Sequence, residues 1–496
     1  MQNSQETNLN DERRSRIESI KLMRERKIVP FGSKYNRETT LDQIKKMAVG
    51  DRVKSAGRVV LLRDMGKITF AHLQDFYSRV QIIFKEDVMG EVEYKTILNF
   101  LNMGDFLGIE GEVFVTKKGE ISIMIKRCEF LSKAMRPLPE KWHGIKDTEL
   151  KYRKRYLDLI MNEETKKRFI LRSRFLWELR KYYHDNGFTE VETPILCNTP
   201  SGALAKPFKS HHNAYGNDVY LRIAPEIYLK EAIIGGFEKI YEVARSFRNE
   251  GVDQSHLQDF TMVEHYCAYW DYKMNMRFTE QMLTEIIKRI NGELKIEILN
   301  RKGELVTVDL SLPWKTVSFK NLILQDCGID IDEFPDVKEL KNIIKKKKIS
   351  IDKIENLGRG NLIDALYKAT SREKIIEPTF LIHHPIDISP LARRNDDNPM
   401  VTDRFQLIIN GWEIVNAYSE LIDPVDQKER FEKQMDMRKH GDEEAMLKDD
   451  EFVEAMEYGM PPVSGWGMGI DRIIALLTQQ PNLRDVVMFP LLKPDR

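Results

Sequence analysis

The sequence predicts an α+β protein in which a small β-barrel or sandwich precedes a larger domain that mixes strands and helices. The chain has 496 residues, and at roughly 100–200 residues per domain this length corresponds to two to four domains. Five short β-rich runs, separated by turns with Gly, Asp and Lys, lie within residues 51–138. Such spacing is typical of a small barrel or sandwich. Strand-like runs and longer helical segments follow over residues 161–496.

The first elements follow from local patterns. Apolar residues between 17 and 28 recur at roughly helical spacing and stop before Pro30, so we expect residues 1–50 to form a helical extension. The β-rich domain of residues 51–138 comes next. A charged stretch with two prolines at its start predicts a linker over residues 139–160.

The larger domain, residues 161–496, begins with a helical pattern around 169–183. Pro225 predicts the start of a second helix, because proline suits the first helical position. Residues 240–269 have the pattern of two antiparallel strands around a polar loop. Residues 311–378 carry a helical pattern and a run of lysines, which predicts a helical insertion with a solvated charged face.

Composition excludes several classes of protein. Lys+Arg and Asp+Glu both number 78, so the formal net charge is zero and the chain is neither a polycation nor an acidic-tail protein. A local basic face for nucleic acid is still compatible with this balance. The four cysteines lie far apart without a CxxC pair, so neither a thiolate zinc site nor a disulfide framework is predicted. With no apolar leader and no run near the ~20 residues that span a bilayer, we expect a cytoplasmic protein with no membrane partner.

Several common catalytic motifs are missing from the sequence. It has no GxxxxGK[ST], GxGxxG, HExxH or GxSxG run. Nucleotide chemistry would therefore need another scaffold.

The predicted hairpin at 240–269 carries an unusual set of side chains. Arg248 and Glu250 precede the loop, and on the returning strand the period of two places Phe260, Glu264 and Tyr266 on one face. A surface strip of ion pairs would account for this hairpin taken alone. An alternative is a binding face.

A second set lies near the C-terminal end. Asn416, Tyr418 and Glu420 share one strand face, and a glycine run then leads to Arg472 at the start of an apolar helix. Glycines allow a ligand to approach the backbone, helix starts favour anions, and arginine suits phosphate. An ion pair at the helix start is the structural alternative.

Together these runs resemble the class II lysyl-tRNA synthetases, from near Arg13 to the C-terminal end. The similar runs are GFTEVETPIL for motif 1, ARSFRNEG with FTMVE for motif 2, and GMGIDRIIALL for motif 3. YLRIAPEIYLK, SPLARRND and NAYSEL resemble the lysine branch. The resemblance implies a five-stranded OB-fold anticodon-binding barrel over 51–138. It also implies a class II catalytic domain over 161–496, built on an antiparallel β-sheet flanked by helices, and a homodimer formed through motif 1.

The resemblance further implies a lysine–tRNA ligase for protein synthesis. The family converts L-lysine and ATP to lysyl-adenylate and pyrophosphate, then transfers the lysyl group to the 3′ end of tRNA(Lys). The residues that match its catalytic positions are Arg248, Arg472 and Glu250. Those that match its ATP-binding positions are Arg248, Glu250, His256, Phe260, Glu413 and Arg472. Those that match its Mg²⁺ carboxylates are Glu413 and Glu420.

A lysine pocket is implied in the same way. The matching residues are Gly202, Glu226, Arg248, Glu264, Tyr266, Asn416, Tyr418 and Glu420. We assign Glu420 and Tyr266 to the side-chain ammonium, and Glu226 and Glu264 with the Gly202 backbone to the α-ammonium. Asn416 is expected to hold the lysine carboxylate beside Arg248.

In the OB-fold domain the resemblance implies an anticodon-binding face. Phe70 would stack on a base, and Arg63, Gln81 and Glu120 would contact base edges, as proteins read single-stranded RNA. A position in the barrel core is the alternative for Phe70.

The sequence departs from the family at a few positions, most notably at Gln406, where the family often has an acid. A neutral amide is a poorer partner for a hard cation, which puts the number or affinity of metal ions in doubt. Three other functions compete: an aspartyl- or asparaginyl-tRNA synthetase, a catalytically altered RNA-binding paralogue, and a relative that transfers lysine to protein. The acidic pocket argues against the first, and the anticodon-reading domain argues against the last.

Overall fold

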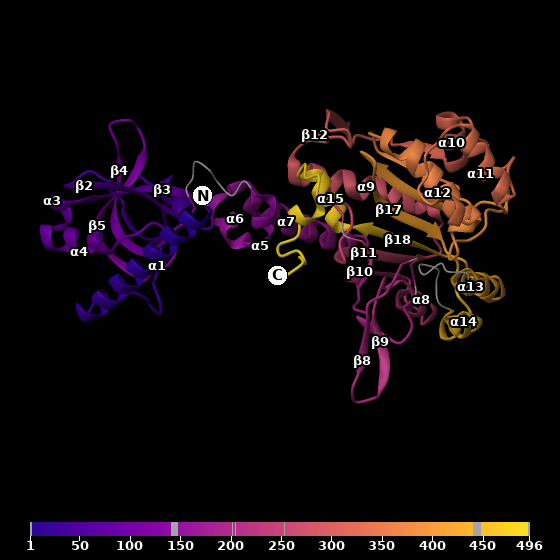
Figure 1. The fold of residues 1–496 in the computed structure, drawn as a ribbon, viewed down its shortest axis with the longest axis horizontal. Helices are drawn as coiled ribbons and strands as arrows, with labels where there is room; N and C mark the ends of the chain where they lie inside the picture. Colours follow the sequence, from indigo (N-terminus) through magenta and orange to yellow (C-terminus); the bar gives the residue numbers. More distant parts are fainter. Residues whose placement is uncertain are drawn as a thin grey trace. The chain divides into compact units, whose positions relative to one another are not determined.

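The structure is a computed structural model that describes residues 2–139, 147–200, 202–203, 205–251, 253–439 and 448–494. It divides into two compact units, Met1–Lys146 and Asp147–Arg496 (Figure 1). Of the predicted linker over 139–160, residues 140–146 lie outside the described residues, and most of the remainder is helical.

The first unit is a closed five-stranded barrel with the strand order β1-β2-β3-β5-β4, which confirms the predicted barrel. Its strands are β1 (Arg52–Asp64), β2 (Ile68–Gln74), β3 (Arg79–Lys85), β4 (Phe106–Val115) and β5 (Ile121–Ser132). Its helices are α1 (Gln2–Glu25), α2 (Leu41–Ile44), α3 (Glu86–Met89) and α4 (Glu91–Phe100). Along β2, buried residues such as Ala71 and Leu73 alternate with half-buried ones, so one face of the strand fills the barrel and the other remains available.

The second unit is built on an eight-stranded sheet with the order β14-β15-β16-β17-β18-β11-β10-β6. Its pairs are antiparallel except β14–β15 and β10–β6 at the two ends, which confirms the predicted α+β class. The strands are β6 (Thr189–Glu190), β10 (Lys239–Phe247), β11 (Asp259–Ala268), β14 (Lys315–Ser318), β15 (Thr379–Ile382), β16 (Arg404–Ile409), β17 (Trp412–Ser419) and β18 (Val463–Gly469). Smaller sheets contain β7 (Leu196–Cys197), β8 (Lys209–His212), β9 (Asn217–Leu221), β12 (Lys295–Leu299) and β13 (Leu305–Asp309).

Helices flank this sheet. They are α5 (Thr148–Arg153), α6 (Arg155–Met161), α7 (Glu163–Asp185), α8 (Glu226–Ile234), α9 (Tyr272–Asn291), α10 (Phe319–Cys327), α11 (Val337–Lys346), α12 (Arg359–Thr370), α13 (Pro424–Lys439), α14 (Asp450–Glu457) and α15 (Ile470–Leu477). Short 3₁₀ turns are η1 (Ile354–Asn356), η2 (Arg372–Lys374), η3 (Ile386–Ile388) and η4 (Leu483–Asp485). Within the segment 311–378, α10, α11 and α12 follow the predicted helical pattern, whereas its first strand, β14, belongs to the main sheet.

The core of the second unit lies on one face of the sheet. Apolar side chains of α7, α9 and α15 pack there against Val263 of β11, Val415 of β17 and Met468 of β18. Because side chains alternate along a strand, the neighbouring residues of β11, β17 and β18 face the opposite side, which a smaller apolar cluster with α8 and α14 covers only in part.

Within the described residues, no helix combines the length and the apolar character that a membrane span requires.

Candidate active site

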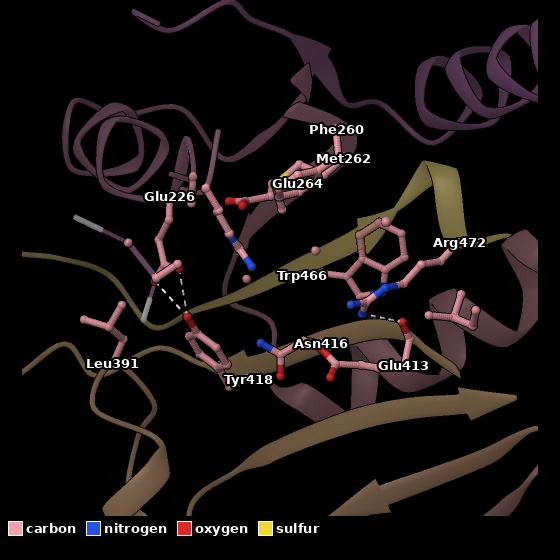
Figure 2. A pocket seen from close by; sticks show the side chains of 18 of the residues that line it. Glu226, Phe260, Met262, Glu264, Leu391, Glu413, Asn416, Tyr418, Trp466 and Arg472 are labelled. Carbon is pink, nitrogen blue, oxygen red and sulfur yellow. Dashed lines mark hydrogen bonds between the residues drawn. The ribbon is translucent and has the colours of Figure 1, made fainter. Parts of the chain in front are cut away.

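A pocket occupies this open face of the sheet (Figure 2). Its walls come from β11, β17 and β18, the start of α8, the loop after β10 and the start of α15. Twelve residues predicted from the sequence line it, and they are Gly202, Glu226, Arg248, Glu250, His256, Phe260, Glu264, Tyr266, Glu413, Asn416, Tyr418 and Arg472. Segments more than 250 residues apart in the sequence thus meet in one cavity, as the motif order predicted.

The floor of the pocket is strand β18. The side chains of Trp466 and Met468 belong to the core, and Gly465, Gly467 and Gly469 line the pocket together with Trp466. A Cβ atom on Gly465 would lie 2.5 Å from Cε1 of Tyr266 and closer still to Oε1 of Glu420. Glycine at this position is therefore needed for two neighbouring side chains to reach the floor.

One end of the pocket is acidic. Glu264 is only 5% exposed, and the hydroxyl of Tyr266 donates a hydrogen bond of 3.3 Å to it. Burial and the nearby Glu226 raise the pKa of Glu264 well above its usual range, against the opposing effect of Arg248. Figure 2 shows Glu264 and Glu226 at this end of the cavity.

Glu226 stands in the first turn of α8, where a carboxylate is favoured by the helix dipole. The hydroxyl of Tyr418 lies 2.8 and 2.9 Å from its two carboxylate oxygens and donates to them. The ammonium of Lys230, one helical turn further on, lies 2.5 Å from Oε1 of Glu226. Sequence analysis did not identify Lys230, because a glutamate and a lysine four residues apart on a helix form an exposed pair in most helices.

Glu420 lies deeper than the other residues predicted for the lysine pocket. It is not among the residues that line the pocket, and it is buried beyond the end of β17 with its Oε2 atom 2.5 Å from Lys230. Burial raises the pKa of Glu420 to about 8, with Lys230 lowering it and Glu226 raising it. Its other oxygen, Oε1, lies next to the floor residue Gly465. Because side chains alternate along β18, a Cβ on Gly465 would point away from the core, so Oε1 of Glu420 lies on the pocket side of the floor in the space that the glycine leaves.

The other end of the pocket is rich in arginine. The guanidinium of Arg472 donates a 3.0 Å hydrogen bond to the main-chain oxygen of Glu413, and the Arg248 guanidinium lies 5.0 Å above the ring of Phe260. Burial alone would raise the pKa of the Glu413 carboxyl, but Arg472 and two other arginines lower it overall. The cations and the aromatic face suit a nucleotide with several phosphates.

The loop after β10 lies over this end. His256 and Glu250 line the cavity, and His256 forms a 2.8 Å contact with Asp253. Arg404 of β16 is a pocket residue that the sequence analysis missed. It donates a 2.9 Å hydrogen bond to Oδ1 of Asn416 and could have been found, since it lies on the same strand face as Gln406.

Glu413 and Glu420 do not lie close enough to bind one metal ion together. They lie at opposite ends of β17, and seven residues at about 3.3 Å each separate them by roughly 20 Å. In the described ranges, no cluster of three or more His, Cys, Asp or Glu side chains could hold a metal ion. Of these two carboxylates, only that of Glu413 faces the arginine-rich end. One carboxylate completed by substrate phosphates and water is nevertheless a usual arrangement for Mg²⁺.

The four residues predicted to bind the anticodon come together in the first unit. Phe70 of β2 pairs directly with Arg63 of β1, so both side chains lie on the same face. On the same sheet, Nε2 of Gln81 donates a 2.9 Å hydrogen bond to Glu120. His72, paired with Gln81 in the ladder, stands between the two pairs and was not predicted.

Comparison with known proteins agrees with this arrangement. The family described as tRNA synthetases class II (D, K and N) matches residues 147–493, and the OB-fold nucleic acid binding domain matches residues 53–131. The lysine–tRNA ligase of Syntrophomonas wolfei is 43% identical over 493 residues, which cover 99% of this chain and 98% of that protein. Those of Carboxydothermus hydrogenoformans and Bacillus cytotoxicus are 43% and 42% identical and cover 98% and 99% of this chain, and 99% of each of those proteins. The chain therefore belongs to the class II tRNA synthetases, and within them to the family of lysine–tRNA ligases.

Proposed function

We propose that this enzyme activates L-lysine with ATP in the pocket and then transfers the lysyl group to the 3′ end of tRNA(Lys) for protein synthesis. The observation that carries the proposal is the meeting of three acids, Glu226, Glu264 and Glu420, around one end of a cavity whose other end is cationic. A ligand with two ammonium groups and one carboxylate matches this distribution of charge. We place the reaction in the cytoplasm, where tRNA and ATP meet.

The acidic end is proposed to select lysine. Glu226 and Glu264, with the Gly202 backbone, would hold the α-ammonium, and Glu420 with Tyr266 would hold the side-chain ammonium beside Gly465. Asn416, held by Arg404, would orient the carboxylate next to Arg248. A site with buried polar partners can reject analogues that lack the matching group by roughly 10⁴–10⁵. Aspartate and asparagine lack the second ammonium, so an acidic end of this kind would exclude them.

The arginine-rich end is proposed to bind ATP and catalyse the first step. A lysine carboxylate oxygen forms a bond to the α-phosphorus, the bond from that phosphorus to the bridging oxygen breaks, and pyrophosphate leaves with the electron pair. Both reactants are anions, so catalysis consists mainly of alignment and charge neutralisation. Arg248 would bridge the carboxylate and the α-phosphate, and Phe260 would stack on adenine. Arg472 would stack above adenine or reach the terminal phosphate, and Glu250 and His256 would close over the nucleotide.

We propose Mg²⁺ as the metal ion, with Glu413 as its protein carboxylate. When bound with ATP, such an ion neutralises phosphate charge. Glu420, paired with Lys230 at the acidic end, is not proposed as a ligand. Gln406, on β16 opposite Asn416, offers only an amide oxygen, so we expect weak metal binding before ATP is present.

The barrel of the first unit is proposed to read the lysine anticodon. Phe70 would stack on an unpaired base, and Arg63, Gln81 and Glu120 would contact base edges. The half-exposed position of Phe70 on the outer face of β2 supports this role over one in the barrel core.

A homodimer through motif 1 completes the proposal. Large apolar side chains are exposed on motif 1 and on α7 before it, with Leu196 at 51% and Trp177 at 61%, and such exposure favours burial against a partner. Light scattering at micromolar concentration should give twice the chain mass. A monomer would contradict the proposal.

The deciding experiment is ATP–pyrophosphate exchange with each amino acid in turn, followed by charging of purified tRNA(Lys). We expect exchange with lysine and charging of this tRNA. Exchange with aspartate or asparagine would favour the nearest rival enzymes, and tRNA binding without exchange would favour a catalytically altered RNA-binding paralogue. Exchange with lysine but no charging would favour a relative that acts on protein.

A further inference from the structure

A lysine is buried between two of the pocket acids. The side chain of Lys230 is 1% exposed, and its ammonium lies 2.5 Å from Oε1 of Glu226 and 2.5 Å from Oε2 of Glu420. The rings of Tyr418 and Phe452 lie 5.7 Å from the same nitrogen. Removing three charges from water costs free energy that an apolar cluster would avoid, so this arrangement requires a reason.

We propose that Lys230 is a positioning residue for lysine recognition, and that its ammonium holds the carboxylates of Glu226 and Glu420 in the orientation that a doubly cationic ligand requires and favours the ionised form of Glu420. This inference rests on the proposed function of the pocket. It concerns a residue that touches the two acids from behind and does not line the cavity.

The contacts of Lys230 give each acid a direction. Lys230 and Tyr418 together engage the carboxylate of Glu226. On Glu420, Lys230 engages only Oε2, and Oε1 is directed toward Gly465 and Tyr266 at the floor of the pocket. Oε1 of Glu420 thus lies at the floor of the pocket, where the side-chain ammonium of the substrate is proposed to bind.

The count of charges supports the same role. Glu226, Glu264 and Glu420 in ionised form carry three negative charges, and the ammonium of Lys230 offsets one of them. The remaining two equal the two ammonium groups of free lysine, while its carboxylate faces Arg248. Without Lys230 the lysine-bound pocket would hold three acids around two cations, and the pKa of Glu420, which Lys230 lowers, would rise further.

Other charged or titratable groups around the pair do not replace Lys230. Tyr418 and Tyr266 carry neutral hydroxyls, because burial and the neighbouring acids raise both pKa values well above the usual range. Glu264 on β11 is an acid itself. Arg404 on β16 is engaged with Asn416 and main-chain oxygen, and Arg248 lies toward Phe260.

The test uses lysine-dependent pyrophosphate exchange in the full-length enzyme. Lys230→Met removes the charge and the hydrogen bonds, Lys230→Gln keeps hydrogen-bond donors without charge, and Lys230→Arg keeps the charge. We expect the first two to raise the KM for lysine roughly 10–100-fold at pH 7, as expected when one partner of a buried charge pair is removed and protonation relieves part of the cost. The KM for ATP should change less than about threefold. Lys230→Arg should restore part of the lysine affinity.

The pH profile separates a charge role from a packing role. In Lys230→Met, raising the pH from 6.5 to 8.5 should ionise more of Glu420, whose pKa burial raises, and recover part of the lost affinity, so the ratio of mutant to wild-type KM should fall. As a matched control, Lys133→Met removes another buried lysine, which pairs with Asp105 in the first unit. It should leave both KM values unchanged.

Three outcomes would overturn the inference: an unchanged KM for lysine in Lys230→Met, full recovery in Lys230→Gln, or failure of both uncharged variants to fold. The last would mean that Lys230 serves the fold alone. Absence of exchange with lysine in the wild-type enzyme is a separate result, because it refutes the proposed function itself.

Discussion

Replacing Gly465 by alanine should block the lysine end of the pocket. The added Cβ atom would lie 2.5 Å from Cε1 of Tyr266, about 0.9 Å short of the 3.4 Å at which ordinary contact begins, and it would lie closer still to Oε1 of Glu420. Neither side chain has room to retreat, because both are buried and Glu420 is held by Lys230 at 2.5 Å. Overpacking of this kind costs roughly 1–3 kcal/mol.

The same overlap falls on the atoms proposed to hold the substrate ammonium. A loss of about 2 kcal/mol in lysine binding corresponds to a roughly 30-fold rise in KM, measured by pyrophosphate exchange. The KM for ATP should stay within about threefold, since the arginine-rich end is further along the floor. Gly467→Ala is the matched control for folding, because its Cβ would meet nothing nearer than 3.5 Å. Its thermal unfolding midpoint should stay close to that of the wild type, whereas that of Gly465→Ala should fall. An unchanged KM for lysine and an unchanged midpoint in Gly465→Ala would refute the reasoning.

Three further predictions concern the pH response, the anticodon and the reacting phosphate. Because burial raises the pKa of Glu420 to about 8, the folded state keeps this proton above the unfolded value of about 4.3. The free energy of unfolding of the lysine-free enzyme should therefore fall as the pH rises between these two values. The KM for lysine should fall over the same range, because the substrate ammonium then meets an ionised acid. A flat KM profile from pH 6.5 to 8 would contradict this. Phe70→Ala should raise the KM for tRNA in charging by roughly 5–150-fold, because about 1–3 kcal/mol of stacking is lost. Lysine-dependent pyrophosphate exchange should stay unchanged. Loss of both activities would indicate misfolding. Arg248→Lys should lower the kcat of exchange by roughly 10²–10³, and near-normal turnover would remove Arg248 from the reacting centre.

Strand periodicity predicted most of the pocket. On β11 the period of two correctly placed Phe260, Glu264 and Tyr266 in one cavity. Glu420 follows the last residue of β17, Ser419, and its Oε1 atom still lies beside the pocket residues Gly465 and Tyr266. The roles assigned to these residues stay predictions until they are measured.

Other features could not be read from local sequence. The burial of Lys230 depends on Glu420, which is 190 positions away in the sequence. The pattern of residues along a helix does not predict a partner at that separation. The pairing of β14 with β15 joins segments about 60 residues apart. The local sequence at the start of the 311–378 segment therefore did not predict that this strand belongs to the main sheet.

One carboxylate connects α15, β11 and α7 through hydrogen bonds. Asp471, at the start of α15, accepts a 2.8 Å hydrogen bond from the main-chain N–H of Thr261 in β11 and a 2.6 Å bond from Arg172 in α7. During synthesis on the ribosome, α7 and β11 emerge long before α15 does. The nucleotide site proposed for this pocket would therefore be incomplete in a nascent chain until α15 has left the exit tunnel, and we expect a truncated product that lacks α15 not to consume ATP.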